Sequence, residues 1–525
     1  MRHRTERQFL LRTAITILLA AAIATSGWSQ GETGQDKATP LSKVERLNRA
    51  PVSKEILKVK LPRPIETVLP NGIDVMILED HRFPLVTVQF EINGAGPLYE
   101  PASQPGLAGA TARLLDQGTK TRTSQEIAEQ IDSLGAKLGA SAGFGSGTAT
   151  VSASGLSDTF EQWFALTTDV LLHPSFPADE LAQYQARTKP TLLQQRSQPN
   201  FLANQTLSRA LYGTYPAAVV STTPESLDSF TPAMLADWLD KRYAPQNTIL
   251  AISGDVRAAT LIPKLREWLA EWQRSKASVT FPPGPAAATK GKVYLVDRPG
   301  SVQTTLLMGN LAIERSDPDY PALVVMNEVL GAGSASRLFL NLREEKGYTY
   351  GVYSNVIARK YAGPWTAGGD LRTDVTDGAM TEFLRELNRI RDEKVPEAEL
   401  DAARRSVVAR FALSLESPQQ LIGYAITRKS YNFPADYWDK YPAQIAAITS
   451  DDVQRVAKKY INPATMQVVA VGDASKIKTV LEKYGPVEMV DVSEKPAVEV
   501  AKPKAGLQSN RLQPVWFRFR FAPNR

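Results

Sequence analysis

The feature that most constrains the fold of this chain is an internal repeat. The segment Thr231–Asp255 recurs as Thr449–Asp473, 218 residues later and without a gap; in each, a Thr opens a helix-like stretch and an apolar run ends on Gly-Asp. Shorter segments repeat in the same order at offsets of 217 and 219 residues, namely Leu78–Asp80 with Leu295–Asp297 and Pro177–Leu181 with Pro396–Leu400. Self-similarity at a nearly fixed offset indicates a repeated structural unit. The sequence therefore predicts a tandem duplication.

Each copy combines strands and helices. Apolar residues alternate with others at 73–77 and 86–92, which is the pattern of half-buried strands. Thr123 and Glu126 form a capping box that opens a predicted helix, and Thr231 and Thr449 have the chemistry of helix N-caps. Strands come in neighbouring pairs with helices between the pairs. The predicted fold class is therefore α+β, with two homologous α/β-sandwich domains in tandem.

The boundaries of these domains follow from composition. A Pro-rich cluster at 282–285 marks a linker between the two copies. We expect a signal peptide at 1–30, an N-terminal extension at 31–61, a first domain at 62–275, the linker at 276–290, a second domain at 291–487 and a tail at 488–525.

The N-terminus has the pattern of a secretory signal peptide. Four Arg precede an apolar run at 13–24, and small residues follow up to Gln30. The apolar run is short for a membrane span, and an uncleaved anchor is the alternative. The chain has no Cys, which excludes disulfides and lipid attachment through an N-terminal Cys. We expect an exported protein, favour the periplasm, and expect no stable membrane span after signal cleavage.

Net charge argues against one class of partner. The whole chain carries +6, and removing the four Arg and one Glu of its first thirty residues leaves +3. A charge this close to zero favours neither a nucleic acid nor a membrane surface. We expect no nucleic-acid partner.

Two stretches carry a resemblance to a known family. The segment Gly106–Arg113, closed by Gly118-Thr119, resembles the active-site helix of the insulinase, pitrilysin and mitochondrial processing peptidase superfamily, where H-x-x-E-H follows Gly-Leu-Ala. In the second copy, the segment Gly333–Tyr350, with Ser-Arg-Leu-Phe, is similar to the C-terminal domain signature of that superfamily. Together with the duplication, the resemblance covers about residues 62–487. It implies the tandem fold of the processing peptidases.

The residues at the family's zinc-binding positions do not fit the metal. In that motif two His four residues apart bind zinc and the Glu between them activates a water. Here Gly109 and Arg113 stand at the two His positions and Ala112 at the Glu position. The resemblance places a third, acidic ligand near residue 190, but the chain has no Asp or Glu between Glu180 and Glu225. The chain is predicted to be a member with a degenerate zinc motif.

No other zinc site is evident. After export only His81 and His173 remain, without Cys, whereas catalytic zinc takes three protein ligands. We interpret both as surface or turn histidines. We expect no cofactor and no metal bound by this chain, and zinc in a partner subunit.

A second pair of family residues is present. Arg343 and Tyr350 match an Arg and a Tyr that, in relatives, face the zinc from the C-terminal domain, and a turn at Gly347 is expected to bring them together. The resemblance implies a catalytic role, in which both donate hydrogen bonds to the scissile carbonyl oxygen. The alternative is structural, with Arg343 paired to a neighbouring Glu and Tyr350 in the core.

Two further segments permit more than one interpretation. The glycine-rich stretch 135–155 is favoured as close packing of a strand pair, with a surface for strand addition by an extended peptide as the alternative. Trp516–Phe521 alternates aromatic and cationic residues and is either an edge strand or a frayed end.

These observations favour one function over two others. We expect a non-catalytic subunit of a heteromeric periplasmic zinc peptidase, which binds extended or unfolded peptides. Its partner is a homologous subunit with an intact H-x-x-E-H motif, to whose zinc site this chain supplies Arg343 and Tyr350. The first alternative is a catalytically dead peptide-binding or structural protein of the same fold. The second, a stand-alone zinc metalloendopeptidase, is disfavoured by the missing ligands.

Overall fold

The structure is a computed structural model that describes residues 55–274, 279–288 and 290–491. The described residues from Ile56 onward group as one compact unit. The expected signal peptide and the aromatic–arginine segment Trp516–Phe521 lie outside the described residues, as do four residues of the expected linker. No helix in the described ranges combines the length and apolarity that a membrane span requires.

Helices and strands of the first half run in this order: β1 (Ile65–Val68), β2 (Asp74–Glu79), β3 (Leu85–Asn93), η2 (Pro97–Tyr99), α2 (Leu107–Arg113), α3 (Ser124–Ser133), β4 (Lys137–Ser141), β5 (Thr148–Leu156), α4 (Phe160–Leu172), α5 (Ala178–Arg196), α6 (Pro199–Tyr212), η3 (Pro216–Ala218), α7 (Pro224–Ser229), α8 (Pro232–Arg242), η4 (Pro245–Asn247), β6 (Thr248–Gly254) and α9 (Ala258–Trp268).

The second half follows with β7 (Lys292–Asp297), β8 (Gln303–Ile313), α10 (Tyr320–Leu330), α11 (Arg337–Phe339), the π-helix η5 (Leu340–Glu345), β9 (Thr349–Val356), β10 (Gly363–Arg372), η6 (Thr373–Val375), α12 (Thr376–Asp392), α13 (Glu397–Ser414), α14 (Pro418–Ser430), α15 (Tyr437–Ala447), α16 (Ser450–Tyr460), β11 (Gln467–Gly472), α17 (Ala474–Leu481), η7 (Glu482–Tyr484) and β12 (Val487–Met489).

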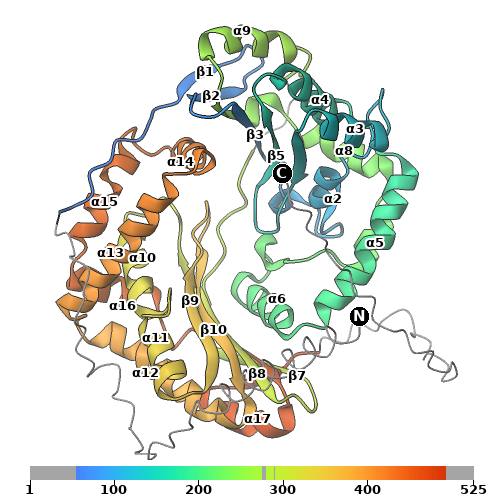
Figure 1. Cartoon of the computed structure of the whole chain (residues 1–525). Helices are drawn as coiled ribbons and strands as arrows, with labels where there is room; N and C mark the ends of the chain where they lie inside the picture. Colours follow the sequence, from blue (N-terminus) through green and yellow to red (C-terminus); the bar gives the residue numbers. More distant parts are fainter. Residues whose placement is uncertain (1–54, 275–278, 289, 492–525) are drawn as a thin grey trace, which may run out of the picture. The chain divides into compact units, whose positions relative to one another are not determined.

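The two halves contain equivalent six-stranded sheets, with strand orders β1-β2-β6-β3-β5-β4 and β12-β7-β11-β8-β10-β9. β6 lies parallel to β2 and antiparallel to β3, and β11 lies parallel to β7 and antiparallel to β8. Ile249 pairs with Glu91, and 218 residues later Gln467 pairs with Gly309. In each half, helices pack on one sheet that mixes parallel and antiparallel strands (Figure 1). The predicted duplication and α+β fold class are confirmed.

Local chemistry explains where the repeated helices begin. The side-chain oxygens of Thr123, Thr231 and Thr449 each accept a hydrogen bond from a backbone N–H in the first turn of the following helix. Thr123 and Thr449 form capping boxes with Glu126 and Asp452, which satisfy further backbone donors. The strands β6 and β11 that follow α8 and α16 are buried along their whole length, as central strands are.

Each half places one helix on the sheet of the other half. Apolar residues of α6, including Leu202 and Leu207, form a core cluster with Val469 and Val471 of β11. Apolar residues of α14 pack in turn on β2 and β6 of the first sheet, where Ile422 and Ile426 join a cluster with Met76, Leu78, Ile249 and Ala251. The second sheet lies between α6 and the layer of α10, α12 and α16 (Figure 1). The two halves therefore share cores as well as a linker.

The segment that precedes β1 packs against the second half of the chain. Leu61 is 7% exposed and lies in the core cluster of the second sheet. Its backbone N–H donates to Asp439 of α15 at 2.9 Å, and Arg63 pairs with the same carboxylate. The extension thus ties the first residues of the described chain to a helix more than 370 residues away.

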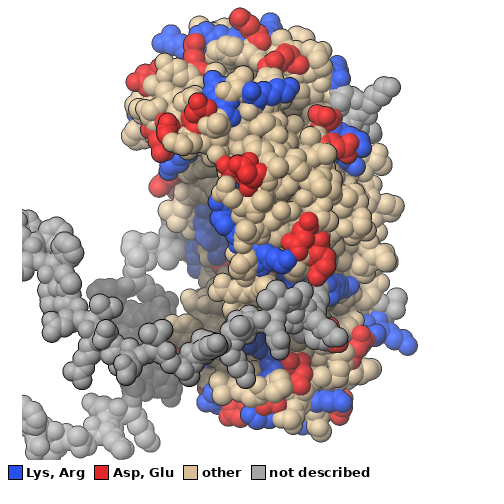
Figure 2. All heavy atoms as spheres, turned by 90° about the vertical axis from the view of Figure 1, so that its right-hand side faces the viewer, with Lys and Arg blue, Asp and Glu red and all other residues tan. Residues whose placement is uncertain are grey.

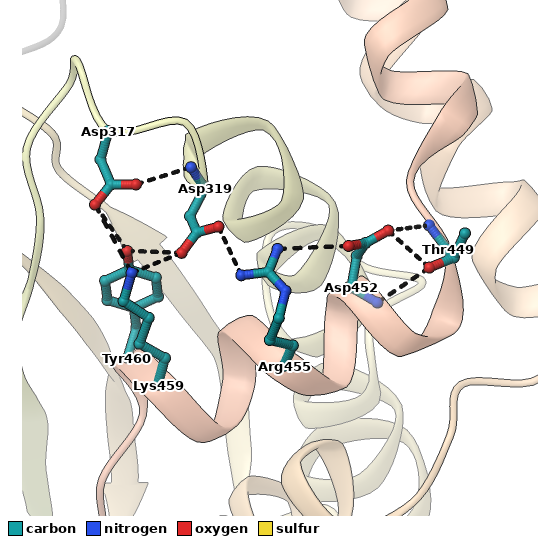
Figure 3. A network of polar contacts seen from close by, with 7 residues as sticks. All are labelled: Asp317, Asp319, Thr449, Asp452, Arg455, Lys459 and Tyr460. Carbon is teal, nitrogen blue, oxygen red and sulfur yellow. Dashed lines mark hydrogen bonds and ion pairs between the residues drawn. The ribbon is translucent and has the colours of Figure 1, made fainter.

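A network of charged residues ties the start of α10 to α16 (Figure 3). Asp319 accepts from Arg455 at 2.6 Å and from Lys459 at 2.8 Å, and the Tyr460 hydroxyl contacts it at 3.1 Å. Burial raises the pKa of Asp319, but these hydrogen bonds outweigh burial, so the pKa lies below its usual value. Arg455 also pairs with Asp452, which caps α16. The network stabilises packing in the second half.

Candidate functional site

A π-helix, a turn and an edge strand build the Arg343–Tyr350 pair. Arg343 lies in η5 and Tyr350 near the start of β9. Gly347 between them has a φ of 64°, a conformation that favours glycine, and its N–H donates to the Arg343 carbonyl oxygen at 3.1 Å. The chain therefore reverses its direction, and Tyr350 returns beside Arg343.

The two side chains contact each other through a cation–π stack. The Arg343 guanidinium carbon lies 5.1 Å from the centre of the Tyr350 ring and 4.8 Å from the centre of the Phe339 ring. The Arg343 side chain is 37% exposed and forms a loose ion pair with Glu344 at 3.5 Å. Tyr350 is 88% exposed, and its hydroxyl has no hydrogen-bond partner in the described part of the chain. Both side chains can therefore donate hydrogen bonds to a ligand from solvent.

A buried polar cluster anchors the π-helix that carries Arg343. Asn341 is 6% exposed, and its side-chain amide donates to Glu382 and Glu386 of α12, each at 2.8 Å. Glu386 also pairs with Arg389 at 3.4 Å. π-Helical turns are rare and are frequent at functional sites. Sequence reasoning missed this cluster, because no local pattern links Asn341 to two carboxylates more than forty residues away.

The Ser-Arg-Leu-Phe signature supports the pair from inside the domain. The Arg337 side chain is 4% exposed and donates two hydrogen bonds of 2.8 Å to the carboxylate of Glu399 in α13. Phe339, two residues on, is buried and stacks against Arg343. The signature therefore fixes α11 against α13 and places an aromatic ring under the guanidinium.

The degenerate metal motif lies on α2 in the first half. Gly109 is partly exposed, Ala112 is buried and Arg113 is exposed. A Cβ at Gly109 would meet the Ala142 carbonyl oxygen at 3.4 Å, so the helix has room for a side chain there. The three residues offer no side-chain lone pair to a cation, and Arg113 brings a positive charge instead.

Helix α5, where the resemblance places the third ligand, does not complete a metal site. Its acidic residues, Asp179 and Glu180, lie in its first turn. Burial raises the pKa of Tyr184 farther along α5, and the nearby Arg113 guanidinium acts against that rise. A guanidinium beside phenol and hydroxyl groups does not fit a zinc ion, which prefers imidazole, thiolate and carboxylate ligands. The residues of α2 and α5 therefore do not fit a catalytic metal ion.

The remaining histidines occupy turns with carboxylate neighbours. His81 follows β2 and contacts Asp255 at 2.7 Å, and His173 follows α4 and contacts Asp169 at 3.2 Å. Within the described ranges, no three His, Asp or Glu side chains are grouped so as to hold a metal ion.

Glu100 is a partly buried acid that sequence reasoning missed. Its carboxylate accepts the backbone N–H groups of Gly106 and Ala108 at 2.8 and 2.7 Å, which caps the start of α2. Burial raises the pKa of Glu100 to about 7, although both hydrogen bonds act in the opposite direction. Glu100 precedes the helix by more residues than the usual capping patterns span, so no local pattern pointed to it.

The two sets of family positions are not brought together within this chain. Gly109, Ala112 and Arg113 lie in the first half, and Arg343 and Tyr350 lie in the second. Among the described residues, no hydrogen bond or ion pair connects the two sets.

The glycine-rich stretch at 135–155 combines close packing with a contact between the halves. A Cβ at Gly155 would lie 2.7 Å from the Trp163 indole nitrogen. The Gly145 carbonyl oxygen accepts from Arg359 at 3.1 Å and from the Tyr361 hydroxyl at 2.7 Å, both in the second half. β4, at the start of the stretch, is an edge strand of the first sheet.

Surface charge is mixed. Acidic and basic side chains are interspersed on the face shown in Figure 2. Such a surface agrees with the low net charge of the whole chain.

Comparison with known proteins gives two adjacent family matches. Residues 75–223 match the insulinase family, peptidase family M16, and residues 229–407 match the peptidase M16 inactive domain. An uncharacterised zinc protease of Bacillus subtilis is 24% identical over 349 residues, 66% of this chain and 83% of that protein. One from Rickettsia bellii is 23% identical over 424 residues, 78% of this chain and 97% of that protein.

Solved structures agree with the fold. The peptidase M16 inactive domain from Pseudomonas fluorescens has a TM-score of 0.73 and 27% identity, covering 78% of this chain and 98% of that one. A Helicobacter pylori protease has a TM-score of 0.72 at 17% identity, covering 78% and 100%. The periplasmic protease PqqL from Escherichia coli has a TM-score of 0.67 at 16% identity, covering 80% of this chain and 46% of that one. By its duplicated fold, its signature residues and these matches, the chain belongs to the insulinase (M16) peptidase superfamily and is similar to its zinc proteases.

Proposed function

We propose that this chain is the non-catalytic subunit of a heteromeric zinc peptidase. It binds extended peptide and supplies Arg343 and Tyr350 to the zinc site of a homologous partner that carries an intact H-x-x-E-H motif. The observation that carries the proposal is the contrast between the two halves. The second half holds Arg343 and Tyr350 stacked and open to solvent, whereas the α2 positions of the first half offer no metal ligand.

The chemistry of the pair is charge stabilisation. Contact with two aromatic rings restricts the Arg343 guanidinium, so it loses less freedom when it donates. The Tyr350 hydroxyl beside it adds a neutral donor. Donors preorganised around a carbonyl oxygen stabilise the negative charge that develops there during peptide cleavage.

We further propose that the protein is exported and works in the periplasm. The basic and apolar pattern of residues 1–30 supports export.

The test is a reconstituted complex with a homologous subunit that has an intact H-x-x-E-H motif. Tyr350→Phe keeps the ring that stacks on Arg343 and removes only the hydroxyl. Loss of one positioned donor lowers turnover by about 10²–10³ in comparable sites, and we expect kcat to fall more than KM rises. Arg343→Ala is expected to lower turnover as well.

Tyr353→Phe is the matched control, since Tyr353 lies on the same strand, is 50% exposed and packs against Phe339 with its ring tilted. It is expected to leave turnover unchanged. Unchanged turnover in both Tyr350→Phe and Arg343→Ala, with the complex intact, would instead favour a peptide-binding protein of the same fold without a catalytic duty.

A further inference from the structure

A polar cavity of about 360 Å³ lies between the two halves, away from Arg343 and Tyr350. Its size is near the lower end of the range of about 300–1,000 Å³ typical of small-molecule sites. One wall is the polar face of β3, and the other walls are the loop between β9 and β10 and the C-terminal part of α14. The hairpin loop around Gly145 lines the cavity as well.

The β3 wall carries one carboxylate without a cation. Glu91 is partly buried and accepts hydrogen bonds from two neutral groups, the Gln89 amide at 2.5 Å and the Thr150 hydroxyl at 3.0 Å. No basic side chain of the described residues forms an ion pair with it. Desolvation raises the pKa of Glu91, and the two hydrogen bonds offset this only in part. A bound cation would therefore supply the counter-charge that the Glu91 carboxylate lacks.

The loop wall carries two cations without a carboxylate. The Arg359 guanidinium donates to the Gly145 carbonyl oxygen at 3.1 Å, and the ammonium of Lys360 lies 5.5 Å from the centre of the Phe281 ring. Neither has an acidic partner within ion-pair distance among the described residues. Desolvation lowers the pKa of Lys360, although the residue as a whole still reaches solvent.

The loop that holds these cations is fixed. Tyr361 is 4% exposed, and its hydroxyl donates to the Gly145 carbonyl oxygen at 2.7 Å. Lys360 therefore lies between two residues that are both bound to the same carbonyl oxygen of the first half. Such a wall presents its charges at defined positions before any ligand arrives.

The duplication shows that these charges are not part of the common fold. Glu91 occupies the same register position in the first sheet as Gly309 in the second. The second half supports an equivalent strand without the acid, so folding alone does not require a carboxylate there.

We propose that this cavity binds a small zwitterion, an α-amino acid or a short peptide, with its ammonium group on Glu91 and its carboxylate on Arg359 and Lys360. The uncharged hydroxyls of Thr427, Ser430 and Tyr431 also line the cavity and supply hydrogen bonds to a peptide backbone. The ligand neutralises three charged groups that otherwise face a partly dehydrated space unpaired.

Calorimetric titration of the full mature chain with glycine, Ala-Ala and Ala-Ala-Ala tests the proposal. At least one of these is expected to bind with one-to-one stoichiometry. For that probe, N-acetylation and C-terminal amidation are each expected to weaken binding by about tenfold or more, the loss of one charge-assisted contact. Absence of binding by all three probes, or equal binding of free and capped forms, would overturn the proposal.

Substitutions that remove one charged side chain of the cavity then locate the site, because each should affect the binding of only one end of the ligand. Glu91→Gln is expected to abolish the preference for the free over the acetylated amino terminus and to keep the preference for the free carboxylate. Lys360→Met is expected to reduce the preference for the free carboxylate over the amide. Glu129→Gln and Lys458→Met change exposed charges outside the cavity and are expected to keep both preferences. If Glu91→Gln and Lys360→Met both kept the preferences for the free amino terminus and the free carboxylate, the ligand would bind elsewhere and the proposed site would be wrong.

Discussion

Arg337 is held by Glu399 through two parallel hydrogen bonds of 2.8 Å, although 62 residues separate them along the chain. The Arg337 side chain is 4% exposed and the Glu399 side chain 33%. The pair connects the signature before η5 to α13, and so fixes the segment that carries Arg343.

Replacing Glu399 by Gln should therefore destabilise the protein. The change leaves a buried guanidinium without its counter-charge. Breaking a fully buried pair costs about 3–5 kcal/mol, and we expect roughly 2–3 kcal/mol here because Glu399 is partly solvated. Denaturant unfolding measures the loss. Glu397→Gln, whose carboxylate is 69% exposed and pairs with Arg404, is the control and should change stability by less than about 1 kcal/mol.

Gly109→Ala should stabilise the protein. Glycine within a helix costs about 0.5–1 kcal/mol relative to alanine, and a Cβ at this position makes only an ordinary contact with the Ala142 carbonyl oxygen. Thermal unfolding is expected to shift upward. Gly155→Ala is the comparison variant with the opposite expectation. Its added Cβ would overlap the Trp163 side chain, so the substitution should lower the stability of the protein. A destabilised Gly109→Ala variant would show that α2 has no room for a side chain.

Glu100 makes stability depend on pH between about 4.5 and 7. Its folded pKa of about 7 lies above the usual value of a glutamate, so between these values the folded state binds more protons than the unfolded state. Stability should therefore fall as the pH rises toward 7, by on the order of 1–3 kcal/mol in total. Glu100→Gln should flatten this dependence. An unchanged slope in the variant would assign the effect to another group.

The purified mature protein should contain far less than one equivalent of zinc and should cleave no peptide by itself. The reason is the chemistry of Gly109, Ala112 and Arg113, which provide neither ligands nor a general base. Elemental analysis and a peptide-cleavage assay with and without chelator check this. One equivalent of zinc together with chelator-sensitive cleavage would contradict it.

The sequence predicted those parts of the fold that depend on local patterns. The gapless repeat of Thr231–Asp255 identified two equivalent units, because the same caps and buried strands recur at the same spacing. Gly347 signalled the turn between Arg343 and Tyr350, because few other residues adopt its backbone conformation. Both signals lie within a short stretch of chain.

Contacts between distant segments left no such signal. The amide of Asn341 bonds to carboxylates on α12, and Glu100 caps a helix that begins several residues away. The cavity at Glu91 is completed by residues more than 260 positions later. Each of these depends on how the halves or helices pack, which a pattern of neighbouring residues does not encode.

Because α6 and α14 each pack on the sheet of the other half, the two halves are not independent folding units. If the chain were cut within its Pro-rich linker, each fragment would lose the helix that covers part of its sheet and would retain a helix made for the other fragment. The two fragments would bury these apolar surfaces only by associating with each other again. The contacts are those of a domain-swapped dimer whose two subunits have been fused end to end. A chain of half this length would accordingly have to associate with a second copy before it had a complete core.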